Sequence, residues 1–283
     1  MNNSQHALVV EGGAMRGIFA AGVLDEFLAQ QYQPFTSYFG VSAGATNVAA
    51  YLCKQATRNY KVITDYSCRP EFINLPRFVK GGHLFDLDWL WQETVREIPL
   101  NTDEFSQSPH DFYIVATAIE SGQAHYLQAT GSEMVEQLKA SCAIPIAYRD
   151  YPKINGMAMT DGGVADSIPV KKAYEMGASE ITVILSQPLG YRKKDNKVPW
   201  LTKQLYKDTP ALAQATIQRS KNYNDSIDFL HNAPPDCKVN IIAPPMGFKV
   251  GRTTKNRAIL NSGYQMGISE AKTYLNNSRF AKE

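Results

Sequence analysis

The chain has 283 residues, of which 44% are hydrophobic and 20% are charged, a composition typical of globular proteins. Its formal net charge is only +2, so no strong field draws the molecule toward nucleic acid, and no nucleic-acid partner is expected. A chain of this length can bury a large core as one α/β unit. We therefore expect a single domain over residues 1–283, with the core motifs in 7–186 and a C-terminal part in 187–283.

The first residues are polar, and no apolar run approaches the roughly 20 residues that cross a bilayer. Neither a secretory signal nor a membrane span is therefore expected. The cysteines are scattered and form no Cys-x-x-Cys pair, which favours reduced thiols over a disulfide framework: Cys53, Cys68, Cys142 and Cys237. These features predict a cytoplasmic protein, which is compatible with a transient contact at the inner membrane surface.

Short apolar or β-branched runs alternate along the chain with segments of helical spacing. Strands are expected at 7–10, 34–39, 112–118, 181–186 and 239–243, with a strand-like lead at 154–160. Helices are expected at 16–28, 43–52, 132–141, 169–176 and 256–275. This alternation predicts an α/β fold with a mostly parallel central sheet and helices on both faces, a three-layer α/β/α sandwich.

The segment 187–210 has a different character. Residues 191–197 carry a basic run, which is followed by Val-Pro-Trp-Leu at 198–201. The run is consistent with a solvated loop that leads into a surface helix. It is also consistent with a lid or a membrane-contact segment, because basic residues beside an exposed Trp200 suit an anionic lipid surface.

Residues 40–44 form a Gly-x-Ser-x-Gly motif between an expected strand and an expected helix. A serine on such a tight turn projects its hydroxyl above the edge of the sheet. Only glycine at the flanking positions, Gly40 and Gly44, clears the crowded backbone. The following helix also directs free N–H groups and positive dipole toward the turn. This setting predicts that Ser42 is a nucleophile.

A glycine-rich loop, Glu-Gly-Gly-Ala-Met-Arg-Gly at 11–17, joins the first strand to the first helix. Such a loop binds a dinucleotide pyrophosphate in one class of protein and an oxyanion in another. The dinucleotide fingerprint requires a glycine where Ala14 stands and an acidic residue after the second strand, where this chain has Ser42 instead. The oxyanion interpretation is therefore favoured. Arg16 is consistent with loop orientation, with charge stabilisation, with contact to a substrate phosphate, or with an ordinary solvated residue.

Two candidates remain for the base that activates the serine. The chain has five histidines, and in the order serine, acid, histidine only His231 follows Asp161. That order is typical of the α/β-hydrolase fold, in which the serine elbow follows several strand–helix units. Ser42 follows the second strand, and this position counts against His231 as the base. Asp161 itself heads an Asp-Gly-Gly motif, in which Gly162 allows a sharp turn that aims the carboxylate. Asp-Gly-Gly is also a common plain turn, so the residues alone leave the base open.

The motifs taken together resemble the patatin-like phospholipase family. The chain supplies a glycine loop ending in Arg-Gly at 12–17, Gly-x-Ser-x-Gly at 40–44 and Asp-Gly-Gly at 161–163, in the family's order. Residues 140–145 resemble the family's Ala-Ser-x-x-x-Pro segment, and 256–267 resemble its C-terminal helix. Four ordered motifs make this resemblance specific.

The resemblance implies the patatin-like α/β/α sandwich and a Ser42–Asp161 dyad that uses no histidine, no metal and no cofactor. It also implies an oxyanion hole from the N–H groups of Gly12, Gly13 and Ala14, with Arg16 in the same loop. Ala14 departs from a frequent glycine but keeps its N–H. Ser167 replaces a frequent Asn and is expected to cap the following helix.

The implied function is a serine acyl hydrolase of lipid esters, of phospholipase A or lysophospholipase type, acting in lipid degradation on a lipid or acyl-ester substrate. Two alternatives stay open: a binding protein that kept the fold without the chemistry, and a Ser-Asp-His esterase of small soluble esters. Segments 66–92 and 187–232 are expected to set selectivity, and the aromatic-rich stretch 78–91 suits either an acyl pocket or plain core.

Overall fold

The computed structural model describes residues 5–107 and 110–280, and these build a mixed eight-stranded sheet. The strand order is β5-β6-β3-β2-β1-β7-β8, and β4 also pairs with β3. The strands are β1 (Gln5–Val10), β2 (Ser37–Val41), β3 (Asp111–Ala118), β4 (Ala124–Gln128), β5 (Lys153–Ile154), β6 (Met157–Asp161), β7 (Ala178–Ile184) and β8 (Lys238–Ile242). The pairs along β3-β2-β1-β7-β8 are parallel, whereas β4, β5 and β6 pair antiparallel. The predicted mostly parallel α/β fold is confirmed.

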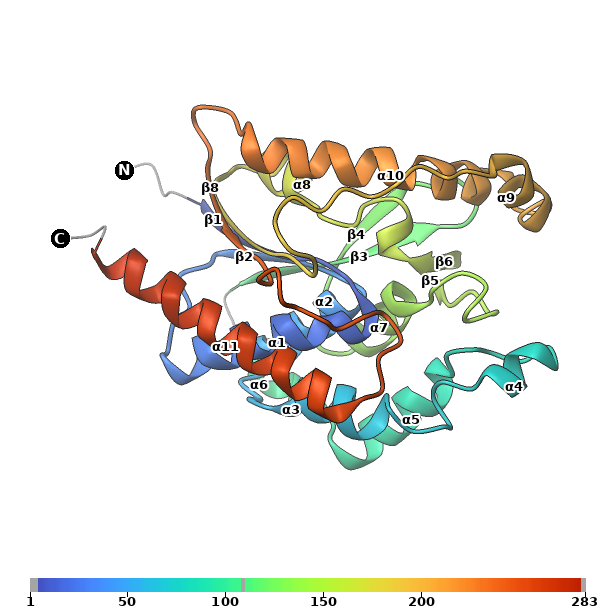
Figure 1. Cartoon of the computed structure of the whole chain (residues 1–283), viewed down its shortest axis with the longest axis horizontal. Helices are drawn as coiled ribbons and strands as arrows, with labels where there is room; N and C mark the ends of the chain where they lie inside the picture. Colours follow the sequence, from blue (N-terminus) through green and yellow to red (C-terminus); the bar gives the residue numbers. More distant parts are fainter. Residues whose placement is uncertain (1–4, 108–109, 281–283) are drawn as a thin grey trace.

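Helices cover both faces of this sheet (Figure 1). They are α1 (Ile18–Ala29), α2 (Ala43–Leu52), α3 (Arg58–Lys61), α4 (Leu75–Val79), α5 (Leu87–Glu97), α6 (Thr102–Ser106), α7 (Met134–Cys142), α8 (Val170–Glu175), α9 (Pro199–Leu205), α10 (Pro210–His231) and α11 (Arg257–Phe280). Short 3-10 turns precede α1 and follow β6, at Ala14–Gly17 and Gly162–Val164.

Alternate residues of the central strand β1 face the two helical layers, as the period-2 geometry of a strand requires. Leu8 and Val10 pack with α1, α2, α7 and α11, whereas Ala7 and Val9 pack with α8 and α10. All four side chains are fully buried. A strand that is apolar on both faces is typical of a parallel sheet covered on both sides.

The first and last helices, α1 and α11, cross at very close range. A Cβ on Gly22 of α1 would lie 2.2 Å from the carbonyl oxygen of Tyr264, and one on Gly267 of α11 would lie 2.1 Å from that of Phe19. Glycine on both helices therefore permits backbone-to-backbone contact. The same contact explains why the C-terminal helix runs alongside the N-terminal one in Figure 1.

Most predicted elements occur with shifts of a few residues, and the 43–52 helix has the predicted bounds. The predicted strand at 34–39 begins only at Ser37. The predicted strand-like lead at 154–160 is a hairpin, because Asn155 and Gly156 adopt positive φ and turn the chain between β5 and β6. The sequence analysis did not identify β4, α10 or the short helices between residues 58 and 106.

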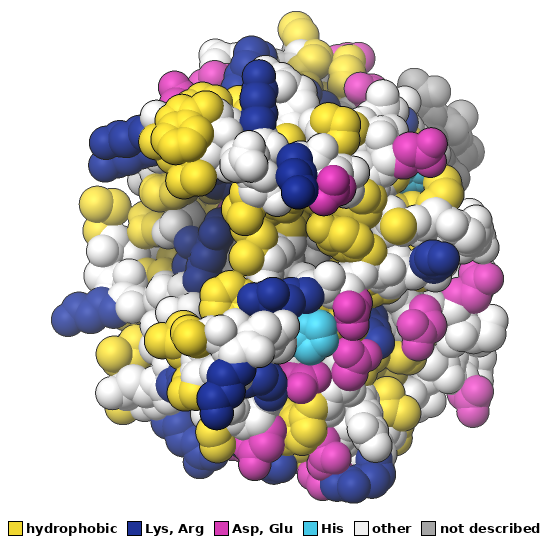
Figure 2. All heavy atoms as spheres, turned by 90° about the vertical axis from the view of Figure 1, so that its right-hand side faces the viewer, with side chains coloured by type: hydrophobic (Ala, Val, Ile, Leu, Met, Phe, Trp, Pro, Cys, Tyr) yellow, Lys and Arg dark blue, Asp and Glu magenta, His cyan; other side chains and the backbone are white. Residues whose placement is uncertain are grey.

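The parallel strands run toward the right-hand side of Figure 1, so their carboxyl ends and the loops after them gather there. Figure 2 shows this side of the molecule face on. In open α/β sheets, ligands bind outside the carboxyl ends of the strands. None of the helices described in the structure is long and apolar enough to cross a membrane.

Candidate active site

Ser42 lies at the turn between β2 and α2 and has φ 53° and ψ −126°. This combination is rare for a residue with a side chain and stores strain of about 1–3 kcal/mol. A Cβ on Gly40 would lie 2.4 Å from the Cα of Ala45, and one on Gly44 would lie 2.4 Å from the carbonyl oxygen of Val10. The two glycines are therefore required sterically, as predicted for a serine elbow.

Ser141 ties this turn to the sheet. The Ser42 N–H donates to the Ser141 hydroxyl at 2.8 Å, and that hydroxyl donates to the carbonyl oxygen of Val115 at 2.6 Å. Ser141 is fully buried. The sequence analysis noted Ser141 only as part of a motif, and the structure shows its contact with the backbone of the elbow.

Asp161, the last residue of β6, lies beside Ser42 although 118 residues separate them in the chain. Asp161 Oδ1 accepts from the Gly163 N–H at 2.8 Å, and the Asp161 carboxyl and Ser42 line the same cavity. Burial raises the pKa of Asp161 above its usual range, and the neighbouring Ser42 hydroxyl partly offsets this rise. A Cβ on Gly162 would meet the Val115 carbonyl oxygen at 2.1 Å, so the turn after Asp161 also requires glycine.

The backbone beyond Asp161 is fixed by two side chains. The Gly163 carbonyl oxygen accepts from the Ser167 hydroxyl at 2.8 Å and from Arg219 Nε at 2.6 Å. The expectation that Ser167 caps the next helix is wrong, because its hydroxyl is used on Gly163 and α8 has no side-chain cap.

The glycine-rich loop runs along the same cavity as Ser42. Gly12, Gly13 and Ala14 line this cavity together with Ser42 and Asp161. A Cβ on Gly12 would lie 2.7 Å from the carbonyl oxygen of Val41, which explains how the loop approaches the elbow so closely. Ala14 adopts φ 50°, a conformation that glycine reaches without strain, so its methyl group is tolerated at a cost.

Arg16 is buried in the structure, so it is not an ordinary solvated residue. Its Nε has no hydrogen-bond partner among the described residues. Burial lowers the pKa of Arg16, while the nearby Glu11 carboxylate acts in the opposite direction. Glu11 is itself held by the Ser186 N–H at 2.7 Å. Arg16 is thus a buried cation within the glycine-rich loop, close enough to Glu11 for the two charges to interact.

An apolar cavity of about 100 Å³ opens beside Ser42. Most of its lining comes from the segment between residues 58 and 100, with α7 on the other side. The aromatic and aliphatic residues include Phe72, Ile73, Phe85, Leu87, Leu90, Trp91 and Leu138. Part of the stretch 78–91 therefore lines a cavity, one of the two possibilities considered for it. A cavity of this polarity suits a hydrocarbon chain.

A second, polar cavity of about 40 Å³ meets the first at Ser42, Ala14, Ile144 and Arg252. It is lined by the Gly12–Ala14 backbone and by the side chains Glu11, Asp161, Lys193, Arg219 and Arg252. The sequence analysis missed these three cations. Arg219 and Arg252 lie in no motif, and Lys193 lies within the basic run that was interpreted as solvated or lipid-facing.

His231 does not approach Ser42. Helix α10 reaches the site through Arg219, whereas His231 is its exposed last residue, twelve positions further on. At a rise of 1.5 Å per residue this separation is about 18 Å along the axis. No histidine lines either cavity around Ser42 among the described residues.

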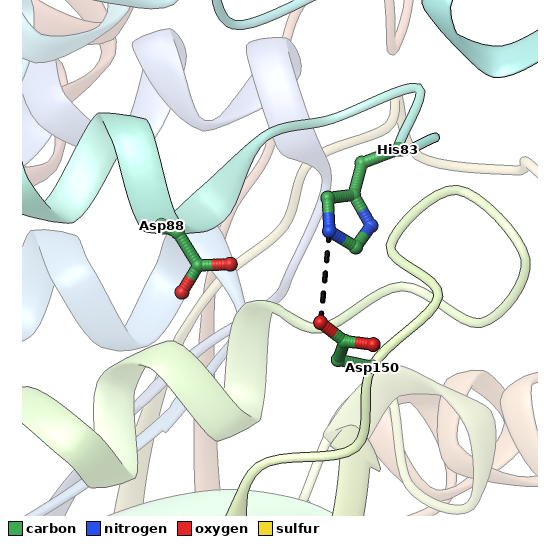
Figure 3. A group of neighbouring side chains, drawn as sticks. All are labelled: His83, Asp88 and Asp150. Atoms are coloured by element: carbon green, nitrogen blue, oxygen red, sulfur yellow. Dashed lines mark ion pairs between the residues drawn. The ribbon is translucent and has the colours of Figure 1, made fainter. Parts of the chain in front are cut away.

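A group of ligand-type side chains lies elsewhere, at His83, Asp88 and Asp150 (Figure 3). Their ligand atoms already have protein partners. His83 Nε2 lies 3.6 Å from an Asp150 oxygen and Nδ1 accepts from the Arg149 N–H, while Asp88 contacts Lys139 Nζ and the Tyr148 hydroxyl. This group serves to connect α5 with the chain around residue 149.

A family model described as "Patatin-like phospholipase" matches residues 8–174 of the chain. The chain belongs to this family. Membership of the patatin-like phospholipase family implies a lipid acyl hydrolase in general terms. The chain is also 36% identical, over 249 residues, to "Uncharacterized protein YjjU" of Escherichia coli (strain K12), covering 84% of this chain and 68% of that protein. A crystal structure of VipD from Legionella pneumophila aligns with 95% of this chain and 67% of that one, with a TM-score of 0.47 and 11% identity.

A second family model, described as "Domain of unknown function (DUF6363)", matches residues 209–279. This segment contains α10, β8 and most of α11, and it follows the patatin-like match. It supplies Arg219 and Arg252 to the cavity at Ser42. In this member of the patatin-like phospholipase family, both matched regions therefore contribute residues to the cavity at Ser42, as does Lys193 from the segment between them.

Proposed function

We propose that the chain is a serine acyl hydrolase of phospholipase or lysophospholipase type, with Ser42 as nucleophile and Asp161 as its base. What supports this most directly is the position of the Ser42 hydroxyl beside the buried Asp161 carboxyl, where both residues line the same cavity and the hydroxyl lowers the pKa of the carboxyl. The pair lies where an apolar cavity, which suits an acyl chain, meets the backbone of the glycine loop. The proposed role of the protein is in lipid degradation.

In the first half of the reaction, the Asp161 carboxylate takes the Ser42 proton while the hydroxyl oxygen attacks the ester carbonyl. The N–H groups of the Gly12–Ala14 loop hold the developing oxyanion, and the buried Arg16 adds a positive charge to the same loop. The intermediate collapses, and the leaving alcohol takes the proton from Asp161. The acyl group remains bonded to Ser42.

In the second half, Asp161 accepts a proton from a water molecule that attacks the acyl-enzyme. The carboxylic acid leaves, and the proton returns from Asp161 to the Ser42 oxygen. A carboxylate with a raised pKa suits this work, because its proton affinity lies closer to working pH than that of an ordinary aspartate. The mechanism uses no histidine.

We further propose that the protein acts as a single domain, because β8 extends the same sheet as β1 and α11 packs against α1. The proposal includes peripheral contact with a lipid surface through α9. Trp200 is 70% exposed there, with Leu201 and Leu205 also exposed. Figure 2 shows hydrophobic side chains among Lys and Arg side chains on this side of the molecule. An aromatic residue among cations suits an anionic interface.

The test is labelling with a fluorophosphonate probe together with hydrolysis of a p-nitrophenyl acyl ester. Ser42→Ala is expected to abolish labelling, and both Ser42→Ala and Asp161→Asn are expected to lower kcat/KM at least about 1000-fold. His231→Ala is the matched control and is expected to retain wild-type activity.

Full activity in either dyad variant would refute the assignment of the pair. Inactivation by His231→Ala would instead favour a Ser-Asp-His esterase. A folded wild-type chain that neither reacts with the probe nor hydrolyses any ester would favour a non-catalytic binding protein.

A further inference from the structure

The polar cavity at Ser42 is surrounded by cationic side chains from distant parts of the chain. Lys193 comes from the segment between β7 and α9, Arg219 from α10 and Arg252 from the segment before α11. Arg16, in the glycine loop, is a further buried cation whose charge acts on Lys193. Among the described residues that line the cavity, the carboxylates are Glu11 and Asp161.

Lys193 is directed inward by its backbone. Its N–H donates to Asn224 Oδ1 at 2.9 Å, and its carbonyl oxygen accepts from Asn224 Nδ2 at 3.0 Å. The Nζ atom lies 4.2 Å from the centroid of the Tyr223 ring. The next residue, Lys194, is exposed. The two hydrogen bonds between the Lys193 backbone and Asn224 of α10 thus separate Lys193 from the solvated run and position it in the cavity.

Within the part of the chain that the structure describes, these cations differ from most surface cations in forming no ion pair. None of Lys193, Arg219, Arg252 and Arg16 forms an ion pair with a carboxylate among the described residues, whereas many surface cations of this protein do. Burial and the neighbouring Arg219, Arg252 and Arg16 lower the pKa of Lys193 to about 7, against an opposite effect of Glu11. Arg16 is buried, Lys193 and Arg219 are half-buried, and Arg252 is exposed. Gathering like charges in such a partly buried site is unfavourable unless an anion joins them.

We infer that this cavity binds the phosphate group of the substrate, and that the substrate is an anionic acyl phospholipid, preferably one with a terminal phosphate monoester. This inference rests on the proposed function. With the acyl chain in the apolar cavity and the ester at Ser42, the glycerol carbons place the phosphate on the other side of Ser42, where the cations lie. Arginine and lysine are the side chains that phosphate oxygens prefer.

The same cavity disfavours a zwitterionic headgroup. Glu11 accepts from the Ser186 N–H and Asp161 from the Gly163 N–H. A choline or ethanolamine cation would meet three cationic side chains there against these two carboxylates. A phosphate monoester carries up to two negative charges at neutral pH and no cation. The cavity volume of about 40 Å³ exceeds the roughly 10–15 Å³ that one water needs, so it admits a small anion.

The experiment compares short-chain phospholipids that stay monomeric, so that attraction to a charged surface does not contribute. Phosphatidic acid, phosphatidylglycerol and phosphatidylcholine with the same acyl chains are hydrolysed by wild type, Lys193→Gln, Arg252→Gln and the control Lys194→Gln. We expect wild type to prefer phosphatidic acid over phosphatidylcholine in kcat/KM. Lys193→Gln and Arg252→Gln are each expected to lower that ratio about tenfold, as for loss of one charge-assisted hydrogen bond. The control is expected to keep the wild-type ratio.

The ratio of kcat/KM for two lipids, measured on one variant, does not depend on the fraction of that variant that is folded. If one variant fails to fold, the other still tests the inference. Inorganic phosphate serves as a second probe: at constant ionic strength it is expected to compete with p-nitrophenyl ester hydrolysis in wild type and less in Lys193→Gln. Strong competition together with no headgroup preference would show a site for free phosphate, and would overturn the lipid assignment.

Equal kcat/KM for all three lipids would overturn the inference while leaving the acyl hydrolase proposal intact. A preference that persists unchanged in both Lys193→Gln and Arg252→Gln would overturn it as well. If wild type hydrolyses no ester at all, the proposed function itself is contradicted. Failure of the headgroup inference and failure of the proposed function are therefore distinguishable.

Discussion

Replacing Ser141 with alanine tests whether the strained turn at Ser42 is held by one buried hydroxyl. The substitution removes the acceptor of the Ser42 N–H and the donor to the Val115 carbonyl oxygen. Ser141 has no solvent exposure, so water has no route to replace either bond. Each orphaned buried group costs about 1–3 kcal/mol, which gives about 2–6 kcal/mol of lost stability for the pair.

Urea unfolding followed by circular dichroism measures this loss. With a slope of about 2–3 kcal/mol per molar urea, the midpoint of Ser141→Ala is expected about 1–2 M below that of wild type. Ser132→Ala is the matched control, because Ser132 is exposed, and its effect is expected within about 0.5 kcal/mol.

The same substitution should also change catalysis in a particular way. The strain at Ser42, about 1–3 kcal/mol, is comparable to the stabilisation that Ser141 provides, so the turn is expected to relax when the hydroxyl is removed. Ser141→Ala should then lower kcat for a soluble ester and leave KM nearly unchanged, because the acyl cavity is intact. Unfolding curves of Ser141→Ala and Ser132→Ala that coincide, or a change in KM alone, would refute this reasoning.

Two further predictions concern the base and the exposed helix. Asp161→Asn is expected to unfold at a higher temperature than wild type at pH 7, because burial raises the pKa of Asp161 and disfavours its charged form. The difference in unfolding temperature should close as pH falls below about 4, because the carboxyl is then protonated in both the folded and the unfolded state. A variant less stable than wild type at pH 7 would contradict this reasoning. Trp200→Ser is expected to weaken cosedimentation with anionic vesicles about tenfold. The control is Met176→Ser, because Met176 is an exposed hydrophobic residue before β7, at the other end of the sheet, and its replacement should not change the binding. Equal binding by wild type and Trp200→Ser would exclude α9 from the contact.

The turn at Ser42 was predictable because its geometry depends on residues that are adjacent in the sequence. Only glycine fits at positions 40 and 44, so the pattern alone located the turn of Ser42 and the start of α2. The meeting of Ser42 with Asp161 depends on how β6 pairs with β3, which no local pattern encodes. The family resemblance supplied the pair of Ser42 with Asp161, and the catalytic roles of both residues remain predictions.

The cations were not predictable for a related reason. Lys193 and Lys194 are indistinguishable in sequence, and only the pairing of the Lys193 backbone with Asn224 on α10 turns one inward. Arg219 and Arg252 occur in segments without a motif, on separate elements that meet only in the folded chain. The short helices between residues 58 and 106 likewise gain much of their stability from packing around a cavity rather than from their own sequence.

The close crossing of α1 and α11 bears on how the protein is made. Helix α1 ends at residue 29 and its partner begins at 257, so at 5–20 residues per second a ribosome needs about 10–50 s to supply the covering helix. Before α11 is synthesised, the apolar face of α1 that packs against it is uncovered. For much of the same interval β1 also lacks β7 as its second neighbour in the sheet. A nascent chain of this kind depends on protection from aggregation. The cavity at Ser42, which also needs Arg252, is completed only when most of the chain has been synthesised.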